Sequence, residues 1–113
     1  MPTTAEEAID QGHACLAQGN MEAAVEQYLL ATQKDPKLAD AWQFLGVALI
    51  KLEKLPEAIS ALQKLVELRP KDPLAYSSLS LALGRAGEVQ KAEEMAGKAK
   101  VAGWGGDPTK LGH

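Results

Sequence analysis

The sequence predicts an all-α fold, a short α-solenoid of three helix–turn–helix repeats with six helices and a short C-terminal tail. Three observations support this. The sequence matches itself at an offset of 34 residues, apolar residues recur with helical spacing, and strand-forming runs are scarce. Only 4% of the residues are aromatic, and the apolar fraction of 46% is rich in Ala and Leu, which favours helices over strands.

The internal repeat is visible in several sets of aligned positions. The sets are Gly12, Gly46 and Ser80; Gly19, Glu53 and Gly87; Ala24, Ala58 and Ala92; Tyr28, Leu62 and Ala96; and Pro36, Pro70 and Trp104. Small residues at positions such as Gly46 and Ala58 let two helices approach closely, whereas larger residues would hold them apart. A repeat of this length indicates units that bury a continuous core against their neighbours.

Local signals define where the helices begin. Thr4 and Glu7 have the spacing of a capping box, and Asn20 can cap the second helix. Pro56 and Pro73 suit first helical positions, where the missing N–H costs nothing. The predicted helices cover about 4–17, 21–34, 38–52, 56–69, 73–86 and 89–102.

The middle unit has the fullest pattern. Its positions are Trp42, Leu45, Gly46, Leu49, Ala58, Leu62 and Pro70. In this spacing the chain resembles the tetratricopeptide repeat family, over about residues 4 to 104. The resemblance implies a right-handed solenoid in one domain over residues 1–113, with repeats at about 5–38, 39–72 and 73–104 and a tail over 105–113.

The third repeat is expected to end the array. Apolar positions of the earlier repeats are replaced there by Glu93, Gly97 and Lys100, which favours a complete three-repeat array with a polar outer face. The Gly-rich tail should break the last helix. We expect Trp104 to fold back over the small residues of that helix, with a role as an anchor for a partner as the alternative. These small residues are Ala96, Ala99 and Ala102.

The resemblance also implies a ligand groove, on the concave side lined by the first helix of each repeat. The candidate groove residues are Glu6, Ile9, Asp10 and His13 in the first repeat; Asp40, Gln43, Phe44, Val47 and Ile50 in the second; and Leu74, Ser77, Ser78, Leu81 and Arg85 in the third. The groove would be acidic at the first repeat, apolar in the centre and basic at Arg85. Phe44 is expected to be exposed because it lies opposite Leu45 and Gly46 on the helix, with a core position as the alternative.

These features predict a protein-interaction module, an adaptor or scaffold that binds a peptide segment of a partner protein. The basic end of the peptide would lie near Glu6 and Asp10. Two alternatives remain: a scaffold that self-assembles by head-to-tail stacking of its acidic first repeat on its more basic third, and a small chaperone for secreted or assembling subunits. Family members that hold acidic chaperone tails use a cationic clamp, and the clamp positions here carry neither cation nor amide. These positions are Ile9, His13, Phe44, Leu74 and Ser78.

Charge and composition argue against other partners. The net charge is −3 and no basic face is evident, so no nucleic-acid partner is expected. No apolar run approaches the ~18 residues of a membrane span, so no membrane association is expected. The start of the chain lacks the pattern of a signal peptide, and we expect a cytoplasmic location.

No catalytic, metal or cofactor site is expected. Asp10 and His13 are one helical turn apart, but the serines of the third repeat are too distant to complete a triad with its ~3 Å reach. His13 and Cys15 project from different helix faces, so they make a poor metal pair. Cys15 is the only cysteine, which excludes an internal disulfide, and it is expected to pack in the core. We therefore predict that the protein is not an enzyme.

Overall fold

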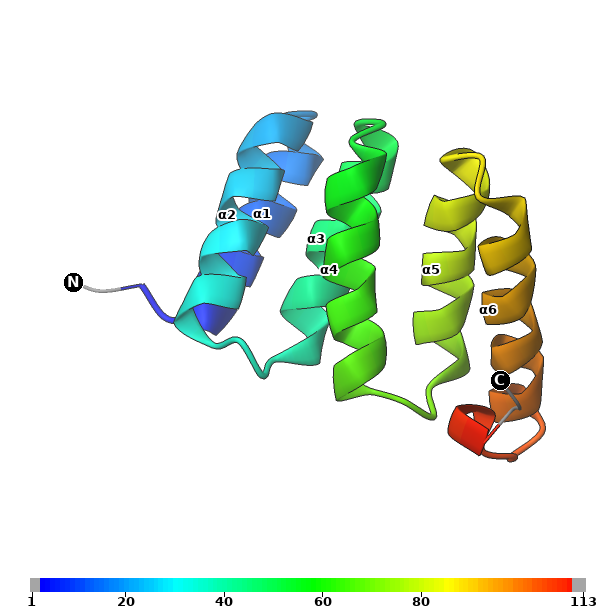
Figure 1. The fold of residues 1–113 in the computed structure, drawn as a ribbon. Helices are drawn as coiled ribbons and strands as arrows, with labels where there is room; N and C mark the ends of the chain where they lie inside the picture. Colours follow the sequence, from blue (N-terminus) through cyan, green and yellow to red (C-terminus); the bar gives the residue numbers. More distant parts are fainter. Residues whose placement is uncertain (1–2, 111–113) are drawn as a thin grey trace.

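A computed structural model describes residues 3–110 and confirms the all-α prediction. The helices are α1 (Ala5–Ala17), α2 (Met21–Lys34), α3 (Ala39–Lys51), α4 (Leu55–Leu68), α5 (Pro73–Arg85), α6 (Val89–Gly103) and the short 3₁₀ helix η1 (Pro108–Lys110). They pair as α1–α2, α3–α4 and α5–α6, and the pairs stand side by side in an elongated array of 47 × 26 × 19 Å (Figure 1). Each predicted α-helix boundary lies within one residue of the observed one. Residues 1–2 and 111–113, part of the predicted domain and tail, lie outside the described range.

The predicted helix caps are present. Thr4 Oγ1 accepts from Glu7 N at 3.1 Å, and Glu7 Oε1 accepts from Thr4 N at 3.2 Å, which completes the capping box of α1. Asn20 accepts from the backbone N–H of Ala23 and caps α2. Pro73 is the first residue of α5, as predicted. The prediction for Pro56 was off by one position, because α4 begins at Leu55.

The first helix of every repeat ends in the same turn. Gly19, Glu53 and Gly87 occupy the aligned turn position and have positive φ angles of 78°, 60° and 85°. In each turn the residue after this position donates its N–H to the carbonyl five residues before it, as Lys54 N does to Leu49 O at 2.9 Å. Glu53 is the one non-glycine residue between 3 and 110 in this left-handed conformation. Glycine adopts this conformation without a steric clash of its side chain in the first and third repeats, whereas Glu53 in the middle repeat has that clash.

Close contact between the two helices of a repeat depends on the glycine of the first helix. A Cβ added at Gly46 would lie 2.5 Å from Leu62 Cδ2, and one added at Gly12 would lie 2.7 Å from Tyr28 Cδ1. In the third repeat, the first helix carries a residue larger than glycine and the second helix carries a small one. Ser80 takes the glycine position opposite the small Ala96 of α6, and its Oγ donates to Ala92 O at 2.7 Å.

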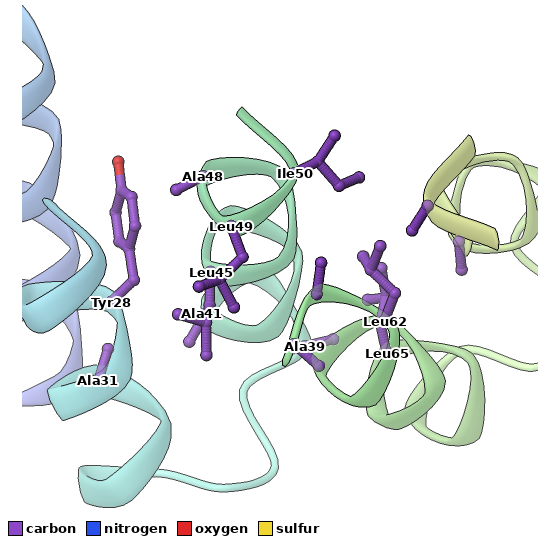
Figure 2. Packing of buried hydrophobic residues seen from close by; sticks show 14 of the residues in the cluster. Tyr28, Ala31, Ala39, Ala41, Leu45, Ala48, Leu49, Ile50, Leu62 and Leu65 are labelled. Atoms are coloured by element: carbon purple, nitrogen blue, oxygen red, sulfur yellow. The ribbon is translucent and has the colours of Figure 1, made fainter. Parts of the chain in front are cut away.

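The core is built from small and branched aliphatic residues at the contacts between helices. Tyr28 and Ala31 on α2 face Ala48 and Ala41 on α3, and Ile50 projects from another side of α3 toward α5 (Figure 2). All five side chains are almost fully buried. A core of this kind fixes the spacing between successive repeats, because interiors are close-packed and yield little.

Aromatic residues attach each later repeat to the linker before it. Trp42 Nε1 donates to the carbonyl of Pro36 at 2.8 Å, and Tyr76 Oη donates to the carbonyl of Pro70 at 2.6 Å. These two bonds occupy the same position in successive repeats, since both pairs are 34 residues apart. The prolines that end α2 and α4 therefore also supply acceptors for the next helix.

The end of the array corrects one prediction. Trp104 does not fold over the alanines of α6; it is 81% exposed. The reason is the turn that ends α6: Gly105 has φ +84°, and Gly106 N donates to Val101 O at 2.9 Å, so the chain reverses immediately after the tryptophan. Pro108 of η1 is buried there instead. Along α6 itself no residue is fully buried.

Gly46→Ala is expected to lower the free energy of unfolding by about 1–2 kcal/mol, because overpacking against Leu62 outweighs the better helix propensity of alanine. In a Leu62→Ala background the same change should cost much less, since the clash is gone. Urea unfolding of the four proteins measures the coupling. Gly97→Ala is the control: nothing lies within 4 Å of its added Cβ, so it should stabilise by about 0.5–1 kcal/mol. An equal cost of Gly46→Ala in both backgrounds would contradict the close-contact argument.

Glu53→Gly is expected to be more stable than Glu53→Ala by about 1 kcal/mol. Both variants lose the carboxylate, but only glycine adopts the left-handed turn without strain. Comparing the two variants by thermal and urea unfolding separates backbone strain from loss of the side chain. Equal stability of the two would show that the turn stores no strain.

Candidate binding surface

The predicted groove residues lie mainly on one surface formed by α1, α3 and α5, here called the first-helix surface. Exposed members are Glu6, Asp10, His13, Asp40, Leu74, Ser77, Leu81 and Arg85, and half-buried members are Gln43, Phe44, Val47 and Ser78. Two predicted members do not belong to it. Ile9 and Ile50 are only 9% and 4% exposed, because both pack into the core between helices.

Phe44 corrects the expectation of an exposed apolar centre. Its ring is half-buried and packs edge-on against His13 at 4.6 Å and stacks on Tyr28 at 5.6 Å, measured between ring centroids. Tyr28 comes from α2 and passes over Gly12 to reach this position. Its hydroxyl and His13 Nδ1 form a hydrogen bond of 2.7 Å. The centre of the surface is therefore an aromatic cluster that joins the first and second repeats.

Tyr28 is the residue of this cluster that sequence reasoning missed. Its position in the repeat is a packing position of the second helix, so the pattern gave no reason to place it near the first-helix surface. Burial raises the pKa of the Tyr28 phenol, and the nearby Cys15 side chain raises it further. The neutral phenol is thus the form that the fold favours.

The exposed apolar part of the surface lies on α5. Leu74 and Leu81 are 53% and 51% exposed and are seven residues apart, which places them two turns apart on the same side of the helix. On α3, Val47 and Phe44 are half-buried apolar members of the same surface. Acidic residues on α1 lie beyond the aromatic cluster. The surface therefore changes from acidic at α1 to apolar at α5.

Two charged members of the surface are engaged in ion pairs, one within the second repeat and one between the second and third repeats. Arg69 Nη2 donates to Asp40 Oδ1 at 2.7 Å, and Arg85 Nη1 donates to Glu53 Oε1 at 2.9 Å. Both pairs are exposed to solvent, so each contributes about 0–1 kcal/mol. The pair of Arg85 with Glu53 links the second and third repeats, and because of it Arg85 offers less positive charge to a ligand than the sequence suggested.

A second surface feature was not predicted. α2 and α4 form the walls and α3 the floor of an apolar hollow of about 610 Å³, here called the α2–α4 hollow. In Figure 1, α2 and α4 stand in front of α1 and α3. Its lining residues are Val25, Leu29, Trp42, Leu45, Leu49, Lys54, Glu57, Ser60, Ala61 and Lys64. The signal that could have revealed it is the pairing of a large exposed residue, Leu29, with the small Ser60 and Ala61 across the gap.

The described residues lack a group of side chains that could hold a metal ion. Between residues 3 and 110, no group of three or more His, Cys, Asp or Glu side chains is arranged to hold a metal ion. In the same part of the chain, no helix has the length and apolarity needed to cross a membrane. Cys15 is half-buried and reduced. The arrangement offers surfaces for recognition.

Comparison with known proteins agrees with this geometry. A family model described as tetratricopeptide repeat matches residues 15–82, which is more than half of the chain. The chain belongs to the tetratricopeptide repeat family. Proteins of this family are interaction modules whose helical repeats present extended binding surfaces.

Several individual proteins resemble this tetratricopeptide repeat chain. PEX5-related protein from Homo sapiens is 33% identical over 85 residues, which covers 75% of this chain but only 14% of that protein. The crystal structure of MamA superposes with a TM-score of 0.85 at 26% identity, covering 91% of this chain and 60% of MamA. The second repeat domain of Spaghetti (RPAP3), bound to the HSP90 peptide SRMEEVD, superposes with a TM-score of 0.80 at 20% identity and covers 87% and 91% of the two chains. At that identity it shows a shared fold.

The buried Tyr28 phenol gives a pH prediction. Its pKa is raised above the ordinary value of 10.0, so the unfolded chain releases the proton first and the free energy of unfolding falls as pH rises past about 10. Tyr28→Phe should be less stable than the wild type by about 1 kcal/mol at about pH 8, through loss of the bond to His13. This difference should shrink at about pH 10.5. Urea unfolding at both pH values tests it, and a constant difference would contradict the shift.

Proposed function

We propose that the first-helix surface binds a peptide segment of a partner protein, and that the protein acts as an adaptor or scaffold. The observation that carries this proposal is the exposed pair Leu74 and Leu81 on α5. Two large aliphatic side chains on one side of a helix, each about half exposed, form an apolar patch of the kind that marks interaction sites. The bound Spaghetti (RPAP3) domain supports peptide recognition by this fold.

The charge distribution on the first-helix surface indicates which kind of peptide segment would bind. Glu6 and Asp10 on α1 are exposed acidic residues at the end of the surface away from Leu81. A segment with apolar side chains over α5 and basic residues over α1 would complement both ends. An acidic tail such as the HSP90 peptide fits less well, because no lysine or arginine of α1 is available and Arg85 is paired with Glu53.

Leu81→Glu is expected to weaken partner binding by at least about tenfold, because it places a charge in the apolar patch. The free energy of unfolding should stay within about 0.5 kcal/mol, since the side chain is half exposed. Wild type and variant serve as bait in a quantitative pull-down with mass spectrometry. Calorimetry then measures the affinity for a peptide from the captured protein. This replaces any test at Phe44, whose packing on Tyr28 would confound binding with stability.

Val89→Glu is the matched control for this experiment. Val89 is 60% exposed but lies at the start of α6, outside the first-helix surface. The control should capture the same proteins as the wild type. Equal loss of capture in both variants, or no loss in Leu81→Glu, would remove the first-helix surface from the proposal.

A further inference from the structure

We propose that this protein associates with copies of itself by inserting Trp104 of one copy into the α2–α4 hollow of another. Trp104 is 81% exposed, the highest value among the exposed large apolar side chains in the described part of the chain. The α2–α4 hollow is an apolar depression large enough for an indole ring. The contact uses neither Leu74 nor Leu81, so it is independent of partner binding at the first-helix surface.

The two features cannot meet within one molecule. α2 lies at one end of the 47 Å array, whereas the C-terminal end of α6 lies at the other (Figure 1). The backbone around Trp104 is held by hydrogen bonds from Trp104 N to Lys100 O and from Gly106 N to Val101 O. The tryptophan therefore stays at the far end of the array, and only the hollow of a second copy is within reach.

Trp104 has the properties of an interface anchor. Tryptophan is enriched among the residues that dominate binding energy at interfaces. The neighbouring glycines, Gly103 and Gly105, leave its ring uncovered, and Gly105 holds the chain in a left-handed turn. Because the backbone is already ordered by this turn, insertion costs little conformational entropy.

The α2–α4 hollow suits an indole in shape and chemistry. Leu45 and Leu49 form an apolar floor, and the partly exposed Leu29 forms one wall. Polar atoms are found at the rim of α4, where the Ser60 hydroxyl and the Glu57 carboxylate can accept a hydrogen bond from the indole N–H. A buried indole needs such an acceptor, so the hollow satisfies both parts of the side chain.

The net charges around the two features are opposite in sign, although Lys54 and Lys64 line the hollow together with Glu57. Lys100 lies one turn before Trp104 on the same side of the helix, and residues 98–110 carry three lysines and one aspartate. The Asp107 carboxylate is already bonded to Thr109. On α2, Glu22 and Glu26 flank the wall of the hollow and are exposed. Attraction between the basic end of α6 and the acidic α2 would orient the insertion.

The contact joins two different surfaces, the end of α6 on one copy and the α2–α4 hollow on the other, so a dimer still has one of each unused. Every added copy presents one unused tryptophan and one unused hollow, and the association grows as an open chain. A single inserted ring with its surroundings buries less than the ~1,200 Å² of a standard interface. We therefore expect weak association, with a dissociation constant on the order of 0.1–1 mM.

Sedimentation equilibrium tests the proposal. The average mass of the wild type should rise with concentration and pass that of a dimer. Trp104→Ala and Leu29→Glu should each remain monomeric at the same concentrations. An equimolar mixture of these two variants should form a one-to-one dimer and nothing larger, because one variant supplies the intact hollow and the other the intact tryptophan.

Control variants separate this contact from other causes. Leu81→Glu and Val89→Glu should associate as the wild type does, because neither residue belongs to the contact. Ser60→Trp fills the hollow from its rim and replaces Leu29→Glu if that variant fails to fold. A wild type that stays monomeric up to about 1 mM, a hollow variant that still associates, or a mixture that forms no dimer each overturns the proposal.

Discussion

Contact between the two helices of each repeat is the constraint on which the rest of the structure depends. In the first two repeats, a glycine on the first helix lies directly against a large side chain from the second, as Gly46 does against Leu62. In the third repeat the larger residue, Ser80, is on the first helix and the smaller, Ala96, on the second. In each repeat one of the two facing residues is small, so the two helices approach closely and the pair can stack on the next with a continuous core.

The same constraint shapes the surfaces. Because Gly12 leaves room, Tyr28 extends from the second helix to the first-helix surface and supports His13 and Phe44 there. In the third repeat, Ala96 leaves a shallow hollow of about 370 Å³ beside Ser80 where the earlier repeats have a large side chain. The residue at this one repeat position thus affects both how stably the two helices of a repeat pack and the shape of the surface beside them.

The two proposed contacts use different residues, although α3 contributes to both, so one molecule could make both at once. The first-helix surface involves α1, α3 and α5, whereas self-association involves the α2–α4 hollow and the end of α6. A chain of copies would then display one peptide site per copy. Linked sites of this kind raise the apparent affinity for a partner that has several copies of the recognised segment. Together the two proposals describe a scaffold whose valency depends on its concentration.

The sequence by itself determined the helix boundaries and the caps, because these depend on residues within a few positions of one another, and it determined the repeat through its match to itself at an offset of 34 residues. The capping box at Thr4 and the side-chain cap at Asn20 are examples of such caps. It also identified the face of α5 that carries Leu81. Only the tertiary structure decided which apolar residues of that surface are covered, since this depends on side chains that arrive from other helices.

Ile50 and Phe44 show the difference plainly. On a helical wheel both point away from the packing side of their own repeat, but neighbouring elements cover them: α5 covers Ile50, and Tyr28 covers Phe44. Trp104 shows the reverse case, because a turn of three residues directs the chain away from the alanines that could have received it. Periodicity assigns a residue to a face of its helix, whereas burial depends on the distances between helices, which the packing of Gly46 and its counterparts sets.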